Sequence, residues 1–167
     1  MRIAFLTPYG QGMGGMEVFN TRLQAVLEPL GHSFEWFTFA QARNHPLFGV
    51  SKAIPFLPHR EKAKAKALAS VFNPHSKKFD LVIANDYFGM YANHAKVVMI
   101  THGYYPDIYE TIAHKTSWLK KQWGISLGRI QQAAIQKSWK HVTVSPRNAE
   151  YLTQHRIRVD ETIPHGI

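Results

Sequence analysis

The fold of this chain is limited most strongly by one pattern: short apolar runs alternate with segments of helical spacing. Most of these runs lack the regular polar alternation of a half-exposed strand, which is typical of parallel strands buried on both faces. They cover residues 2–6, 33–39, 81–84, 97–100 and 141–145, and helical spacing marks 15–30, 59–72, 117–140 and 147–155. Because parallel strands need long crossover connections, the pattern predicts an α/β fold, a Rossmann-like doubly wound parallel sheet with helices on both faces.

The connecting segments allow further predictions. The stripe Phe19, Leu23, Val26, Leu27 and Leu30 predicts a helix that ends at Gly31. Three prolines in residues 44–58 favour a loop with one short strand at 50–54, and residues 104–112 are expected to be irregular. A small helical segment is expected at 87–94, and the helix over 117–140 has possible breaks at its two glycines, Gly124 and Gly128.

Length and composition limit the possible partners. The 167 residues suit one domain, and none of the apolar stretches approaches the roughly 20 residues of a spanning helix. The absence of cysteine excludes disulfides and thiolate chemistry, so we expect a cytoplasmic protein. The net charge of +9 favours polyanionic partners. We expect no nucleic acid among them, because no recognition motif is present.

Polar residues and glycines follow several of the predicted strands. In an open parallel sheet, ligands bind beyond the carboxyl ends of the strands. The first strand leads into the glycine-rich residues 10–15, the next apolar runs lead into Asn85-Asp86 and Thr101-His102-Gly103, and Ser145 precedes the last helix. The sequence therefore predicts a polar ligand cleft at this edge of the sheet.

The glycine-rich loop allows two interpretations of its chemistry besides a plain turn. Gly14 and Gly15 bring bare backbone N–H groups to a helix N-terminus, where a phosphate binds well. Residues 10, 12 and 15 also satisfy the dinucleotide pattern G-x-G-x-x-G. The ribose-binding acid of that pattern is missing from residues 38–41, so an NADP site would depend on Arg43.

Three side chains near the predicted cleft have both functional and structural interpretations. His102 directly follows a strand and could donate a hydrogen bond to a sugar hydroxyl or a developing charge, although a lone histidine is often structural. Asp86 could accept from sugar hydroxyls or cap the next helical turn. Arg147 could meet a phosphate or be solvated.

Taken in order, several segments resemble the amino-terminal domain of retaining glycosyltransferase family 4. The chain opens MRIAFLTPYGQGMGGMEVFNTRLQAVLEPLGH, like the family's first strand, GG loop and helix. FDLVIANDYFGMYA, VVMITHGYYP and KHVTVSPRNAEYL resemble its later strand ends. TIPHGI resembles the isoleucine-proline-asparagine-glycine segment that leads into the second domain, with His165 in place of asparagine.

The resemblance implies metal-independent sugar transfer from a nucleotide-sugar donor to an acceptor with retention, without a further cofactor. It places Gly14 and Gly15 near the donor diphosphate and the acceptor, His102 on the donor sugar, and Glu17 and Asp86 on the acceptor side. The substrate-binding candidates, besides catalytic His102, are Gly14, Gly15, Glu17, Asn85, Asp86, Thr101, Gly103, Ser145 and Arg147. It further implies a single GT-B amino-terminal domain over 1–167 that ends at a linker near 163–167, with the nucleotide pocket in a carboxyl-terminal domain absent from these residues.

A basic binding module without catalysis is the alternative. Residues 117–140 combine Trp118, Trp123 and Trp139 with several lysines, and 59–78 adds more basic residues, a composition suited to peripheral docking on an anionic membrane. In the competing interpretation the tryptophans belong to the core of a soluble domain and the lysines are solvated.

Overall fold

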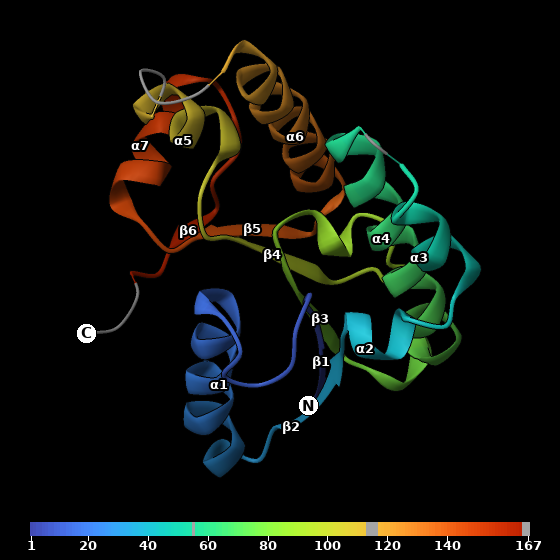
Figure 1. Ribbon diagram of the computed structural model, residues 1–167. Coiled ribbons are helices and arrows are strands. Elements are labelled where there is room, and N and C mark those ends of the chain that lie inside the picture. Colours follow the sequence, from blue (N-terminus) through green and yellow to red (C-terminus); the bar gives the residue numbers. More distant parts are fainter. Residues whose placement is uncertain (55, 113–116, 165–167) are drawn as a thin grey trace.

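The computed structural model describes residues 1–54, 56–112 and 117–164, and a parallel sheet forms its centre (Figure 1). The described strands are β1 (Arg2–Leu6), β2 (Ser33–Phe37), β3 (Leu81–Asn85), β4 (Val97–Thr101), β5 (Lys140–Thr143) and β6 (Glu161–Thr162). They pair in parallel in the order β2-β1-β3-β4-β5-β6. This arrangement confirms the predicted Rossmann-like α/β fold.

Helices cover both faces of the sheet. They are α1 (Gly15–Leu27), α2 (Phe39–Ala42), α3 (Pro46–Ser51), α4 (Leu57–Phe72), α5 (Tyr105–Thr111), α6 (Trp118–Lys137) and α7 (Pro146–Gln154), with 3₁₀ turns η1 (Glu28–Leu30), η2 (Asn73–Lys78) and η3 (Asp86–Gly89). Alternate β1 residues point to opposite faces. Ile3 and Phe5 join a core under α1, whereas Ala4 and Leu6 join a larger core that includes residues of α4 and α6.

The strand order contains a topological switch point between β1 and β3. The chain leaves β1 for β2 on one side, then returns across the sheet to β3 on the other side of β1. The register pairs Leu6 with Ala84, so Thr7 and Asn85 follow at neighbouring strand ends. Ligand sites of open α/β sheets lie at such points, because the helices leave in opposite directions and open a crevice.

Three connecting segments differ from the sequence-based predictions. The strand expected at 50–54 is wrong, because residues 46–51 form α3. Pro46 lies in its first turn, and the His45 side chain accepts a hydrogen bond from the Leu47 N–H. The irregular segment expected at 104–112 is also wrong, because it contains α5, which packs against α6. The expected helix at 87–94 reduces to η3.

Helix α6 runs without a break through both of its glycines, where the sequence had allowed one. A Cβ on Gly124 would meet the Tyr109 ring, and a Cβ on Gly128 would meet Pro106. The two glycines therefore let α5 lie directly against α6, and they serve packing between helices. The last helix forms as predicted. The Ser145 side chain caps α7 by accepting a hydrogen bond from the Asn148 N–H.

Several apolar side chains expected in the core are exposed. Val26 and Leu30 are 65% and 68% exposed, because the apolar cluster beneath α1 includes Phe19 and Leu23 but not the following turn. Trp118 is 72% and Trp139 49% exposed, so the interpretation that places the tryptophans in the core is wrong for these two, whereas Trp123 is half-buried. No helix in the described part of the chain is long and apolar enough to cross a membrane. The linker prediction falls partly on 165–167, outside the described residues.

Candidate active site

A directed chain of hydrogen bonds joins three strand ends at the switch point. The Thr7 hydroxyl donates to Glu17 Oε1 at 2.5 Å, and Asn85 Nδ2 donates to the Thr7 oxygen at 2.9 Å. This fixes the Asn85 amide, so its Oδ1 faces His102 Nε2 at 3.3 Å. Because that oxygen can only accept, Nε2 carries the proton. The buried Glu17 and Asn85 thus orient the half-buried His102.

The start of α1 is built around the Glu17 carboxylate. Glu17 is 1% exposed, and its Oε1 also accepts from the Tyr9 N–H at 3.3 Å. A Cβ on Gly14 would lie 2.6 Å from Glu17 Oε2, so a larger residue here would displace that carboxylate oxygen. Gly15 has open space around it and begins the helix without a side-chain cap on the preceding residue. The backbone N–H groups at Gly14–Gly15 therefore have no side-chain cap, while Glu17 fixes the loop through its hydrogen bonds with Thr7 and Tyr9.

Asp86 follows β3 in a left-handed conformation, with φ of 48°. Its carboxyl group is buried and accepts from Gln131 Nε2 at 3.0 Å and from the His102 backbone N–H. Burial raises the pKa of Asp86 from 3.8 to about 7, although both hydrogen bonds act to lower it. Around neutral pH this carboxyl group can therefore both accept and donate a hydrogen bond.

Gln131 is a site residue that the sequence did not indicate. It is 0% exposed and lies on α6, where its Nε2 donates to Asp86 and, at 2.8 Å, to the Gly103 carbonyl. Its Oε1 accepts from the Tyr105 N–H at 3.0 Å. One side chain thus ties α6 to the ends of β3 and β4. A glutamine within an amphipathic helix gives no local signal of such a role.

A cavity of about 320 Å³ opens beside Asp86 and has a largely aromatic wall. Lys64 and Glu61 also line it, 2.8 Å apart, and Tyr87 donates to Glu61 at 3.2 Å. Burial raises the pKa of Tyr87 and Tyr105, so both phenols stay protonated as hydrogen-bond donors. The aromatic residues that line this cavity are Tyr9, Phe39, Tyr87, Phe88, Tyr105 and Tyr109. Apolar walls with a few convergent polar groups suit a small polar ligand such as a sugar.

A second cavity, of about 300 Å³, lies beside His102, and Gly103, Ser145 and Arg147 also line it. Arg147 is engaged there in an ion pair with Asp107 at 3.2 Å and a hydrogen bond to the Thr111 hydroxyl at 2.9 Å. Phe19 packs edge-on against His102, with ring centroids 5.6 Å apart. The structure therefore places His102 and Asp86 beside different cavities.

Thr101 lies behind the site. It is 0% exposed, and its hydroxyl is hydrogen-bonded to His141 Nε2. Because His141 Nδ1 lies 2.5 Å from the Arg158 carbonyl, which only accepts, Nδ1 carries the proton and Nε2 accepts from Thr101. Burial lowers the pKa of His141, which favours this neutral form. The contacts assign Thr101 to strand pairing, and its role toward a substrate stays a prediction.

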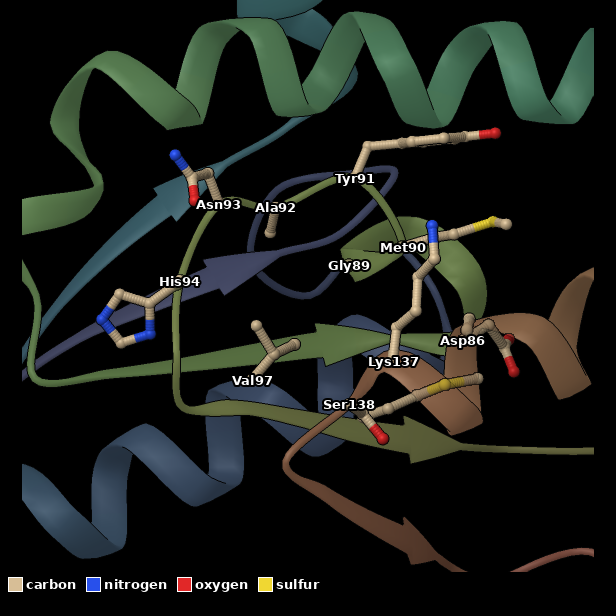
Figure 2. Close-up of a pocket in the computed structure, with 12 residues that line it drawn as sticks. Asp86, Gly89, Met90, Tyr91, Ala92, Asn93, His94, Val97, Lys137 and Ser138 are labelled. Carbon is tan, nitrogen blue, oxygen red and sulfur yellow. The ribbon is translucent and has the colours of Figure 1, made fainter.

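A third cavity, of about 330 Å³, lies between η3 and α6 (Figure 2). It runs from Asp86 past Met90 to His94, and the Lys137 side chain rises toward Tyr91 in this view. Lys137 Nζ lies 5.6 Å from the Tyr91 ring centroid. Within the described ranges, no group of three His, Asp or Glu side chains is placed to hold a metal ion.

Comparison with known proteins identifies a family. A family model described as Glycosyltransferase Family 4 matches residues 13–167, which is most of the chain. No curated protein matches the sequence. The family match gives no support to the dinucleotide and non-catalytic alternatives.

Proposed function

The chain belongs to glycosyltransferase family 4, and from that premise we propose that it binds the acceptor and part of the donor for sugar transfer from a nucleotide-sugar. The observation that carries the proposal is the convergence of the α1 N-terminus, Asp86 and His102 at the switch point. In this reaction the bond from the anomeric carbon to the leaving diphosphate breaks, and a bond to an acceptor oxygen forms. The acceptor hydroxyl loses its proton, and the anomeric configuration is retained.

The donor diphosphate is proposed to lie at the N-terminus of α1. Backbone N–H groups there have no side-chain cap at Gly14, and the helix dipole favours negative charge. Gly15 leaves open space for a phosphate to approach the backbone. The Glu17 carboxylate is turned toward Thr7 and Tyr9, beneath the loop, where their hydrogen bonds satisfy it.

The acceptor is proposed to bind in the aromatic cavity beside Asp86. A carboxyl group with a pKa of about 7 can hydrogen-bond to an acceptor hydroxyl in either protonation state. Aromatic walls bury the apolar faces of a sugar ring, while Glu61 and Lys64 supply polar partners.

His102 is proposed to act on the donor sugar. The chain through Asn85, Thr7 and Glu17 holds its ring in one orientation, so little reorganisation is needed when charge develops in the transition state. Gly103 and Ser145 line the cavity beside it and are proposed to contact the donor. We further propose that a second, nucleotide-binding domain completes the cleft in the full-length enzyme.

The test is sugar transfer by the full-length gene product with a panel of labelled nucleotide-sugars and acceptor extracts, followed by NMR of the anomeric proton. His102→Ala is expected to lower turnover by about 10²-fold, because a preorganised donor is lost. His155→Ala, an exposed histidine beyond α7, serves as the control. Near wild-type turnover of the His102 variant would remove His102 from the mechanism, and the absence of transfer with every donor would overturn the proposed function.

A further inference from the structure

The positive charge of the chain is concentrated on two neighbouring helices. Together α4 and α6 contain eight of the 20 Lys and Arg residues but one of the 11 Asp and Glu residues. That acid is Glu61, which is 8% exposed and already paired with Lys64 at 2.8 Å and Arg60 at 3.5 Å. Neither helix therefore presents an unpaired acid, and both attract anions.

Large apolar side chains are exposed on the same helix pair. Trp118, Leu119 and Ile125 of α6 are 72%, 49% and 43% exposed, and Phe56, just before α4, is 38% exposed. A shallow cavity of about 230 Å³ joins the two helices, and Phe56, Lys62 and Arg129 line it. Basic and exposed apolar groups thus occur together on these two helices. We call the following residues the docking face: Phe56, Lys62, Trp118, Leu119, Lys120, Lys121, Ile125 and Arg129.

The docking face lies near the candidate active site. Helices α4 and α6 connect successive parallel strands, so their N-termini point to the carboxyl edge of the sheet, where the switch point also lies. Residues of the same two helices line the aromatic cavity from the inside, namely Glu61, Lys64 and Leu127.

We propose that the docking face binds the surface of a membrane that contains anionic lipid. Tryptophan, leucine and isoleucine enter the interfacial region, and flanking lysines pair with the headgroups. Charge complementarity selects this occupant, because the cations of the docking face form no ion pair with any described residue. Its exposed apolar side chains would leave water when they enter the membrane interface. Binding at this face does not depend on sugar transfer, so it is tested separately from the proposed function.

The test is sedimentation of the full chain with sucrose-loaded vesicles of phosphatidylcholine alone or with about 30% phosphatidylglycerol. Binding is expected only to the anionic vesicles, with release as salt rises from 0.1 M to 1 M and the Debye length falls from about 10 Å to about 3 Å. K120E/K121E is expected to weaken binding by about 10-fold or more. Its matched control is K77E/K78E on η2, an adjacent exposed lysine pair outside the docking face.

Two tryptophan variants separate membrane insertion from simple charge attraction. Both Trp118 and Trp139 are exposed, but they lie near opposite ends of the α6 segment. Trp118→Ala is expected to weaken vesicle binding several-fold, whereas Trp139→Ala leaves it unchanged, and unaltered urea transitions confirm that both variants are folded. Equal binding to neutral vesicles, equal effects of the two lysine pairs, or full binding by Trp118→Ala would overturn the proposal. The last result would indicate that charge attraction alone, without insertion of Trp118, holds the protein on the vesicles.

Discussion

Asp86 combines two unfavourable features at the centre of the candidate site. Its φ of 48° lies in the left-handed region, which is uncommon outside glycine, although aspartate tolerates it better than most residues. Its carboxyl group is also buried, which penalises the charged form. Gln131 and the His102 backbone offset part of that penalty through hydrogen bonds. Strained, buried acids are often found at functional sites, where the neighbouring structure holds them in place.

The raised pKa predicts how stability depends on pH. The folded state binds the Asp86 proton more tightly than the unfolded state, so its contribution is complete below pH 3.8 and is lost as pH rises through about 7. Asp86→Asn removes this titration, so the variant should gain stability relative to wild type between pH 5 and pH 8. Urea unfolding of both proteins at pH 5 and pH 8 measures how the difference in their free energies of unfolding changes with pH.

Comparison of variant with wild type also cancels the opposite effect of His141. The lowered pKa of His141 gives stability that is present above pH 6.5 and is lost as pH falls, in both proteins. Asp80→Asn, at an exposed carboxylate on the N-terminal side of β3, is the control. An identical pH dependence for Asp86→Asn and wild type would contradict the assignment of a raised pKa.

At the scale of the elements, the pairing of α5 with α6 depends on two glycines. Gly124 and Gly128 are one turn apart on α6 and face Tyr109 and Pro106 of α5. The close approach places Tyr105 where its backbone N–H reaches Gln131, so the same packing also supports the contacts to Asp86 and Gly103. The α5–α6 pair is therefore part of the support of the site.

Gly128→Ala is expected to destabilise the domain by about 1–3 kcal/mol, because the new methyl group would lie 2.6 Å from Pro106 Cδ. Gly49→Ala provides the matched control, since Gly49 lies in α3 with nothing within 4 Å of an added Cβ. That change should be neutral or stabilise by up to about 1 kcal/mol. Chemical denaturation measures the free energy of unfolding of both variants. Equal stabilities would show that α5 shifts away from the new methyl group without loss of stability.

At the scale of the whole molecule, the site lies at an open edge of one sheet. Residues at the ends of β1, β3 and β4 meet beside the point where the strand order reverses. Residues that follow these strands line the cavity beside Asp86, and residues that follow β4 and β5 line the cavity beside His102. A donor and an acceptor held at such an edge need a second wall to exclude water and to fix their relative orientation.

Residues 1–167 alone are therefore expected to unfold cooperatively in urea but to transfer no sugar. The hydrophobic cores on both sheet faces support independent folding, whereas the proposed nucleotide-binding wall lies in a second domain. Donor-dependent transfer assays on the purified residues 1–167, beside the full-length enzyme, measure this. Robust turnover by the shorter protein would show that a single domain is sufficient.

Local sequence patterns determined most of the elements of this protein. Apolar runs predicted β1, β3, β4 and β5, and helical spacing predicted α1, α4 and α6, because these periodicities reflect which face of an element is buried. The cap at Ser145 was predictable because it is a local contact, with its partner Asn148 only three residues away. The strand ends also indicated His102 and Asp86 as candidates.

Tertiary structure alone decided how these residues work together. Thr7 and Asn85 are 78 residues apart, and only the strand order brings them into a hydrogen bond. Gln131 reaches Asp86 from 45 residues away, and α5 packs against the two glycines of α6. Local propensity contains no information about such distant partners. The raised pKa of Asp86, the orientation of His102 and the exposure of Trp118 follow from packing between elements that only the folded chain brings together.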